Sequence, residues 1–312
     1  MCAVQGSNLR PPPCKGGALP TELTAREGRA YGRVPSAAVN RPTATAGRLL
    51  TAGCALLFAA PAVLMVLGSL RGRGLPPPRG LEIVPAAPTF SAYEAVLTLL
   101  PWTTYLRNSL VVVAVAVPLT VLVAATAGWG IRLLPRRAKH GVVTIAFLAL
   151  LVPVTAVWAT RFELFRLVGA VDTFVPLVAL ALLGTSPFYV LVYVWAFHRL
   201  PEEQYQAAAV DGAGPLRTLW SIALPQVRPI TLAVVVLAFA FHWSNFLDPL
   251  LYLNTPSRFT APLGLRLLQQ LNPTDWPLLM AGAVMLAVPA VAVFLLGQRV
   301  FLHDPLHVLE DR

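Results

Sequence analysis

The sequence predicts an all-α integral membrane protein with six transmembrane helices and with both termini in the cytoplasm. Of its 312 residues, 56% are hydrophobic and only 12% are charged, about half the charged fraction of an average soluble domain. It also contains six long apolar stretches, and its Lys and Arg residues gather on one side of them. A surface with so few charges must face lipid or protein over much of its area. This composition excludes an ordinary soluble enzyme, and also a disordered chain, which requires low hydrophobicity.

The six apolar stretches contain no Lys, Arg, Asp or Glu. Each has close to the roughly 20 residues that a helix needs to cross the hydrocarbon core of a membrane. They run over residues 49–70, 109–131, 142–160, 174–197, 230–247 and 277–297. Several contain proline, which helices in a bundle tolerate because neighbouring helices satisfy the freed carbonyl groups. We therefore expect one helix from each stretch, with kinks at Pro61, Pro118, Pro153, Pro187 and Pro289.

The distribution of Lys and Arg predicts the orientation. With the N-terminus in the cytoplasm, 16 of the 24 Lys and Arg residues fall on the cytoplasmic side, as the positive-inside rule requires. Nine of the ten net positive charges lie in residues 1–48 and 132–140. Such a basic total can indicate nucleic-acid binding, but charges beside membrane helices indicate orientation, and we expect no nucleic-acid partner. The residues that carry this signal in the second segment are Arg132, Arg136, Arg137 and Lys139, with anionic lipid as an alternative contact.

The ends of the chain are expected to be tails. Residues 1–47 are rich in Pro, Gly, Arg and Ala and show no apolar period, which predicts a disordered cytoplasmic tail or, alternatively, a stretch upstream of the true translation start. No short apolar core follows the first Met, so a signal peptide is not expected. The membrane domain should cover residues 48–301, followed by a cytoplasmic tail over residues 302–312. Cys2, Cys14 and Cys54 show neither a pairing nor a metal pattern.

The loop between the fourth and fifth apolar stretches predicts a short helix–turn–helix. Pro201 suits the start of a helix, and Glu202 and Glu203 complement its positive end. Three alanines at 207–209 have high helix propensity and give the helix a thin side that another backbone can approach. Gly212 can supply the left-handed residue that ends it. Such an element could dock into a groove on a partner protein.

This loop resembles a pattern found in the membrane subunits of binding-protein-dependent ABC importers. The family pattern is Glu-Ala-Ala-x-x-x-Gly, then nine residues, then Ile-x-Leu-Pro. Here the nine residues 213–221 separate the two halves, and Gln206 stands where the family has Glu, with Glu203 expected to carry part of that contact. The resemblance implies coupling to an ATPase through Glu203, Gln206, Ala207, Ala208, Asp211, Gly212, Ile222, Leu224 and Pro225.

Other segments resemble the sugar-importing branch of this family, the maltose-type second permease. They include residues 88–94, 108–110, 169–173, 242–250, 260–265 and 276–299. The likeness covers roughly residues 48–301, whereas residues 302–312 lack the Gly-Ala-x-Lys-Gly ending of many members.

The resemblance implies a division of labour in a bacterial plasma (inner) membrane. The chain would form half of a translocation path for a mono- or oligosaccharide, together with a second related permease subunit. A dimer of ABC ATPase subunits would bind ATP and Mg, and an extracytoplasmic solute-binding protein would deliver the sugar. The chain itself contains no Gly-x-x-x-x-Gly-Lys-Ser/Thr phosphate loop, so we expect neither enzymatic activity nor a cofactor in this subunit.

Polar residues near the end of the fifth stretch are candidates for the substrate path. His242, Asn245 and Asp248 recur at intervals of three and would share roughly one helix face, with Trp243 on another. Polar groups at membrane depth usually face a cavity or another helix. One interpretation is hydrogen bonding to sugar hydroxyls with Trp243 as a stacking surface. The other is that these residues hold helices together.

Two further sites are expected to serve the fold and not the solute. Asn108 and Ser109 are expected to cap the second helix, and Gly282, flanked by alanines, is expected to mark close helix packing.

Two alternatives to a sugar permease remain open on the sequence. An importer permease for another solute, such as a polyamine, a glycerol-phosphate-like compound or a peptide, would keep the mechanism and change the ligand. No Lys or Arg lies within an apolar stretch, which favours a neutral, hydroxyl-rich solute. A channel or a membrane enzyme is the second alternative, but the stretches lack the gathered ionisable residues that an enzyme needs.

Overall fold

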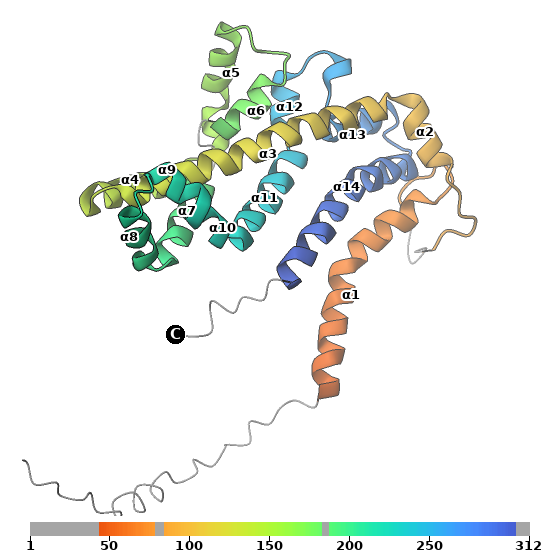
Figure 1. Ribbon diagram of the computed structural model, residues 1–312. Helices are drawn as coiled ribbons and strands as arrows, with labels where there is room; N and C mark the ends of the chain where they lie inside the picture. Colours follow the sequence, from red (N-terminus) through yellow and green to blue (C-terminus); the bar gives the residue numbers. More distant parts are fainter. Residues whose placement is uncertain (1–43, 79–83, 183–186, 304–312) are drawn as a thin grey trace, which may run out of the picture. The chain divides into compact units, whose positions relative to one another are not determined.

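The computed structural model describes residues 44–78, 84–182 and 187–303 (Figure 1), and within these ranges the chain is helical with no β-strand. The chain divides into two compact units, residues 1–58 and residues 59–312. The described part of the first unit is the beginning of helix α1 (Ala44–Ser69). Most of the predicted N-terminal tail, and the predicted tail 302–312 except its first two residues, lie outside the described residues.

The second unit contains the remaining helices, of which several are short. Their bounds are α2 (Ser91–Leu99), α3 (Trp102–Leu133), α4 (Arg136–Leu151), η2 (Val154–Val157), α5 (Trp158–Leu167), α6 (Val175–Leu182), α7 (Pro187–Arg199), α8 (Glu202–Val210), α9 (Pro215–Thr218), η3 (Leu219–Ala223), α10 (Leu224–Gln226), α11 (Arg228–Trp243), α12 (Leu247–Tyr252), η4 (Pro256–Arg258), α13 (Ala261–Leu271) and α14 (Trp276–His303).

Four helical segments of the described chain are long and apolar enough to cross a membrane. They are Gly47–Ser69, Trp102–Leu133, Val175–Arg199 and Trp276–Gln298, and residues 183–186 of the third lie outside the described ranges. Two further candidates are bent helix pairs, so the number of spans is four, or six if each bent pair counts as one. The prediction of an all-α, multi-pass membrane protein is confirmed. The side of the membrane on which each terminus lies stays a prediction.

The third predicted span is not one helix. Helix α4 ends at Leu151, and α5 continues after the short turn η2 in a direction 90° away. Val152 has an extended backbone (ψ 118°) immediately before Pro153. A proline disfavours the helical conformation of the residue before it and has no N–H for the helix ladder. The expected kink at Pro153 is therefore a complete break.

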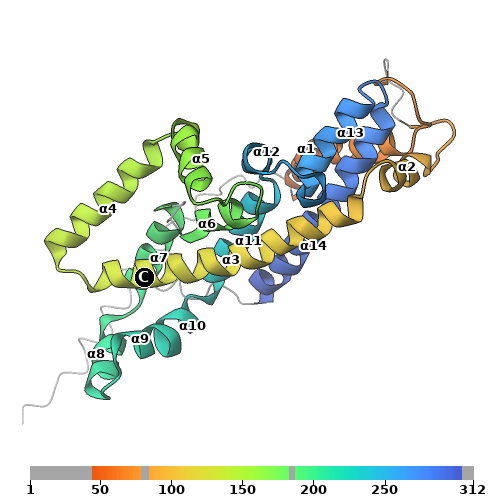
Figure 2. The same cartoon turned by 90° about the horizontal axis from the view of Figure 1, so that it is seen from above.

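Helix α3 is the longest in the described chain, with 32 residues. It packs against α6, α7 and α11, and in Figure 1 α6 lies on the opposite side of α3 from α7 and α11; Figure 2 shows the same helices from above. The expected cap at Asn108 and Ser109 is wrong, because α3 begins earlier and buries both residues in its interior. Asn108 Nδ2 donates to the carbonyls of Ser257 and Phe259 at 2.9 and 3.0 Å, and Ser109 Oγ accepts from the N–H of Ala261 at 2.9 Å. The two side chains thus hold the loop before α13 against α3.

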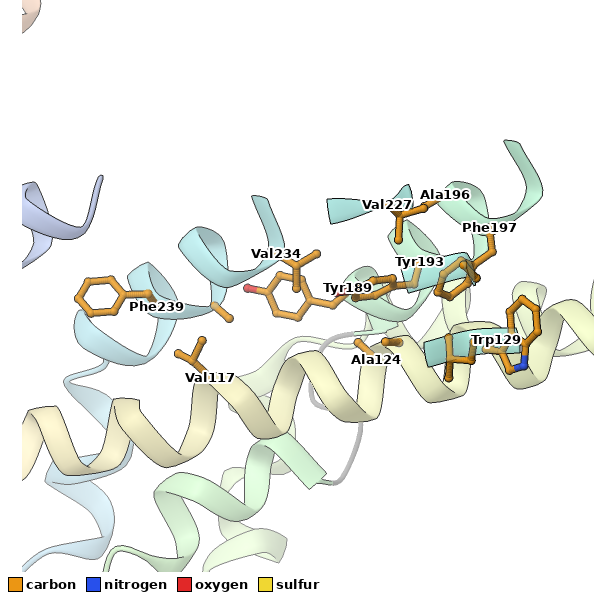
Figure 3. Close-up of a cluster of buried hydrophobic side chains, with 14 of the residues drawn as sticks. Val117, Ala124, Trp129, Tyr189, Tyr193, Ala196, Phe197, Val227, Val234 and Phe239 are labelled. Carbon is orange, nitrogen blue, oxygen red and sulfur yellow. The ribbon is translucent and has the colours of Figure 1, made fainter. Parts of the chain in front are cut away.

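The main core joins α3, α7 and α11 (Figure 3). Its large side chains include Trp129, Tyr193, Phe197 and Phe239. A Cβ atom on Gly128 would lie 2.7 Å from the Cβ atom of Tyr193, so α3 and α7 approach too closely for any larger residue there.

A second close approach lies at Gly282 in α14. A Cβ atom at this position would lie 2.8 Å from Leu268 Cδ1 and 2.9 Å from Leu265 Cδ1 in α13, as the sequence predicted.

Candidate functional site

The segment after α7 contains the expected helix–turn–helix. Helix α8 ends at a glycine in the left-handed conformation, Gly212, with φ 72°. The Gly212 N–H donates to the carbonyl of Ala209 at 3.1 Å, and the Ala213 N–H donates to that of Ala208 at 2.9 Å. This pair of hydrogen bonds is the Schellman arrangement, which satisfies carbonyls that a helix end otherwise leaves free. Gly212 therefore has the role that the sequence predicted.

A wide turn, which the sequence analysis did not predict, follows α9. Residues Leu219–Ala223 form one π-helical turn, in which the N–H of Leu224 donates to the carbonyl of Leu219. Pro225 comes next, and its ring would clash with the carbonyl of Ser221 in a regular α-helix. The extra residue in the turn accommodates that ring. A proline inside an otherwise helical run is the signal from which this turn could have been predicted.

The inner face of α8 is anchored to the main core. Tyr205 and Ala208 are buried, and the Tyr205 hydroxyl donates to the carbonyl of Phe197 at 3.1 Å. The Tyr205 ring centroid lies 5.5 Å from that of Trp129. Burial raises the pKa of the Tyr205 hydroxyl, so it stays a neutral donor. These contacts fix α8 to α3 and α7.

Arg132 adds a polar contact at the same place. Its guanidinium carbon lies 3.6 Å from the centroid of the Tyr205 ring, and its Nη2 lies 2.5 Å from Glu202 Oε2. The Arg132 side chain is only 10% exposed. The sequence predicted this residue as a topology signal alone, whereas in the structure it also ties the end of α3 to the first turn of α8.

The outer face of this segment is exposed. We define it by the exposed residues Glu203, Gln206, Ala207, Val210, Asp211, Leu216 and Trp220. Val210 is 88% exposed and Leu216 is 68% exposed, so this face offers two large apolar side chains for contact with a partner.

The residues predicted for ATPase coupling divide between the two faces. Ala208 was expected on the thin side that a partner approaches, but it lies on the buried face of α8 with Tyr205 and is 4% exposed. Ile222 and Leu224 are half-buried, and Leu224 packs on the main core. The predicted residues exposed to solvent are Glu203, Gln206, Ala207, Asp211, Gly212 and Pro225.

The second candidate site lies where α11 ends. The predicted fifth span to residue 247 is too long, because α11 ends at Trp243 and a new helix, α12, begins at Leu247. His242, Asn245 and Asp248 therefore do not share one helix face. Asn245 instead starts α12: its Oδ1 accepts from the N–H of Asp248 at 3.2 Å, and its Nδ2 donates to Asp248 Oδ2 at 2.7 Å.

Asp248 also pairs with a cation that the sequence analysis did not single out. Arg161 Nη2 lies 3.3 Å from Asp248 Oδ1, and the two side chains are 14% and 8% exposed. The Arg161 Nε atom is buried without a hydrogen-bond partner. Arg161 directly follows the third apolar stretch, and the break at Pro153 turns it inward with α5.

His242 and Trp243 are both buried. Thr120 Oγ1 donates to the carbonyl of Ala116 at 2.7 Å and lies 3.5 Å from His242 Nε2, so the imidazole is the donor in that contact. Trp243 Nε1 donates to the carbonyl of Leu286 in α14 at 3.0 Å, and its ring stacks on Phe239. These are the contacts of a residue that joins helices, which favours that interpretation for Trp243.

The space beside these residues is small. A pocket of about 10 Å³ is lined by His242, Asn245, Ser109, Thr260 and others, about the volume that a single water molecule needs. No sugar ring fits there in this conformation. Among the described residues there is no group of three or more His, Cys, Asp or Glu that could hold a metal ion.

A turn near this site contains Asp172, which was noted in the sequence only as part of the segment 169–173. Asp172 has φ 61°, and its Oδ1 accepts from the N–H groups of Asn254 and Thr255 at 2.9 and 3.0 Å. Its Oδ2 accepts from Thr255 Oγ1 at 2.5 Å and from Arg258 Nη1 at 3.1 Å. The Thr255 hydroxyl, followed by the two N–H groups, lowers the pKa of the Asp172 carboxyl to about 2. Asp172 thereby fixes the loop after α12.

Comparison with known families gives one match that covers more than half of the chain. Residues 116–302 match the model of the binding-protein-dependent transport system inner membrane component.

Curated relatives match over most of their length. The sulfoquinovosyl glycerol transport system permease protein SmoH of Agrobacterium fabrum is 24% identical, over 77% of this chain and 85% of the relative. The arabinooligosaccharides transport system permease protein AraQ of Halalkalibacterium halodurans is 28% identical, over 81% and 92%. The sn-glycerol-3-phosphate transport system permease protein UgpE of Yersinia enterocolitica is 32% identical, over 50% and 56%.

Solved structures share the fold. A chain of a bacterial ABC transporter involved in the import of the acidic polysaccharide alginate superposes with a TM-score of 0.68 at 18% identity, over 82% of this chain and 95% of that one. A chain of the alginate transporter in complex with an alginate pentasaccharide-bound periplasmic protein gives 0.59 at 14% identity, over 81% and 92%.

Proposed function

The chain belongs to the family of binding-protein-dependent transport system inner membrane components, and on this premise we propose that it is the permease subunit of a bacterial ATP-driven sugar importer. It forms half of the translocation path in the inner membrane and is not itself an enzyme. ATP and Mg are bound by a separate ATPase dimer.

The observation that carries this proposal is the two-faced construction of the α8–α10 segment. Its inner face is fixed to α3 and α7 through Tyr205, and Arg132 of α3 holds its first turn, while its outer face exposes Val210 and Leu216. A rigid connection inside and an apolar, partly acidic surface outside suit an element that passes a movement of the ATPase to the helices. Rigid-body shifts of packed helices are a common form of such coupling.

The proposed partners follow from the family. A second, related permease completes the path, and an extracytoplasmic solute-binding protein delivers the solute. The similar alginate transporter has been solved with a periplasmic protein bound, which supports the second of these partners.

A sugar is the proposed solute because the names of the relatives SmoH and AraQ specify sugar-containing solutes. The ion pair between Arg161 and Asp248 is consistent with a neutral solute, because the two charges cancel each other. The relative UgpE is named for sn-glycerol-3-phosphate, so a glycerol-phosphate-like anion is the second candidate.

The test is ATP-dependent uptake by the assembled importer in proteoliposomes. The solute-binding protein encoded beside this chain is first screened for sugars, polyamines, glycerol phosphates and peptides by its change in melting temperature. We expect a sugar to bind and then to be taken up only with ATP on the side of α8. Gly212→Pro should abolish uptake without preventing membrane insertion. Uptake of the bound solute without ATP would contradict the importer proposal. If the solute-binding protein bound glycerol phosphate and no sugar, glycerol phosphate would replace the sugar as the proposed solute.

A further inference from the structure

A groove of about 390 Å³ lies between α4 and α7, at the end of α7 that leads into α8. Its walls are apolar and consist of Val143, Phe147, Leu191, Val194 and Trp195. Its remaining lining residues, Lys139, His140 and His198, are all basic.

The two walls are regular helix faces. On α4, Lys139, Val143 and Phe147 recur every four residues and therefore lie in one row. On α7, Leu191, Trp195 and His198 form the facing row. No residue of α4 is buried, and Phe147 and Trp195 are 59% and 51% exposed. The groove is thus apolar along most of its length and basic at one end. Arg199, whose guanidinium carbon lies 4.2 Å from the centroid of the Trp195 ring, covers one face of that ring.

The charge at the basic end is not compensated. His198 Nδ1 lies 2.7 Å from the carbonyl of Val194, which can only accept, so Nδ1 carries the hydrogen. His198 Nε2 therefore accepts from the Lys139 ammonium group, 3.0 Å away. Because the partner of Lys139 is a neutral imidazole, its positive charge remains available to an anion.

The start of α4 also carries uncompensated positive charge. Its first turn contains Arg136, Arg137 and Lys139 and no acidic residue, although the positive end of a helix favours negative charge. None of the three takes part in an ion pair within the described chain. An anion from outside the chain would relieve this repulsion.

We propose that this groove binds an anionic phospholipid in the leaflet on the side of α8, which is the cytoplasmic leaflet in the orientation proposed above. The phosphate lies between Lys139 and His140, and one acyl chain follows Val143 and Phe147 against Trp195. Basic pockets between membrane helices on the cytoplasmic side are suited to anionic head groups. A helix of the partner permease would cover the apolar wall but would leave the basic end without a counter-charge, so the lipid explains both features.

The experiment is native mass spectrometry of the full chain in detergent, with palmitoyl-oleoyl phosphatidylglycerol or phosphatidylcholine added at equal concentration. We expect more phosphatidylglycerol than phosphatidylcholine to be retained. Lys139→Gln should lower phosphatidylglycerol retention about fivefold, the usual effect of one basic residue near an anionic lipid. Val143→Trp, which fills the groove, should lower it with every charge intact.

Controls separate this site from general charge and from phosphate alone. Arg107→Gln removes one charge near the opposite end of α3 and should leave retention unchanged. Soluble glycerol phosphate should not displace the lipid, because it lacks the acyl chain. Equal retention of the two lipids, or full retention by Lys139→Gln, would overturn the proposal. It would also be overturned if the assembled importer retained no phosphatidylglycerol and Val143→Trp prevented the second permease from joining, since the groove would then be a protein interface.

Discussion

Ala207 and Ala208 are neighbours in α8, yet Ala207 is exposed and Ala208 is only 4% exposed on the buried face of the helix. One substitution at the two positions therefore separates docking from folding. Ala207→Trp should abolish ATP-dependent uptake and binding of the ATPase, because it places a large ring on the outer face. Its effect on stability should be within about 0.5 kcal/mol, as for other surface changes.

Ala208→Trp is the matched comparison. Overpacking a core typically costs about 1–3 kcal/mol, so this variant should melt at a lower temperature than the parent chain. Thermal unfolding followed by fluorescence-detected size exclusion, together with co-purification of the ATPase, measures both effects. Normal uptake by Ala207→Trp would show that the outer face does not dock.

Gly212→Ala should destabilise the turn between α8 and α9 through the backbone alone. A Cβ atom there would meet nothing within 4 Å, but the residue has φ 72°, a conformation that costs a non-glycine residue roughly 1–2 kcal/mol. Gly130→Ala is the control, because it lies inside α3 with equally open surroundings. There the same change should stabilise the helix, by up to about 1 kcal/mol. Equal melting temperatures for the two variants would contradict the role assigned to Gly212.

Long apolar runs and single special residues could be predicted from the sequence. The stretches 109–131 and 277–297 lie inside α3 and α14, and Gly212 was predicted because few other residues adopt a positive φ. At Pro153 a kink was predicted, and the structure has a complete break. The sequence does not show whether neighbouring helices can satisfy the carbonyl groups that a proline leaves free, and this decides between a kink and a break. The face of α8 that Ala208 occupies depends on Tyr205, three residues earlier, which packs on Trp129 more than seventy positions away in the chain.

The contacts of Asp248 and Asn245 were harder to predict, because they depend on residues distant in the sequence and on where α11 ends. Asp248 was singled out, but Arg161 lies 87 positions before it, and only the direction of α5 after Pro153 brings them together. Likewise, Asn245 was predicted to lie on one face of α11 with His242. The end of α11 at Trp243 was not predicted, because no proline or glycine follows it directly. The signal at this end is Asn245 itself, a typical residue at the start of a helix.

Asp172→Asn should loosen residues 254–258 without changing the backbone of the turn, because asparagine also adopts positive φ readily. The amide NH₂ group cannot accept from the Thr255 hydroxyl or from Arg258 as Asp172 Oδ2 does. Hydrogen exchange at pH 7 should therefore be faster in this segment of the variant. Asp211→Asn, an exposed change at the end of α8, should leave it unaffected.

The pH dependence of the parent chain follows from the same carboxylate. Its folded pKa is lowered to about 2 from 3.8, so its stabilisation is complete above about pH 4 and is lost as the pH falls through 2. After correction for intrinsic exchange rates, protection of residues 254–258 should decline over this range in the parent chain only. A parallel decline in Asp172→Asn would assign it to another group.

Asp248→Asn should be strongly destabilising, because it leaves the Arg161 guanidinium group largely buried without a counter-charge. Breaking a buried ion pair in this way typically costs about 3–5 kcal/mol. Exchanging both partners, Arg161→Gln with Asp248→Asn, removes the charges together and keeps hydrogen-bonding groups in place, so much of the loss should be recovered. Melting temperatures of the parent, the two single variants and the double variant form a double-mutant cycle that measures the coupling. If the pair serves folding alone, the double variant should also take up the sugar with an unchanged KM. Recovered stability with lost uptake would instead place Arg161 and Asp248 in contact with the solute, whereas additive losses would refute the coupling itself.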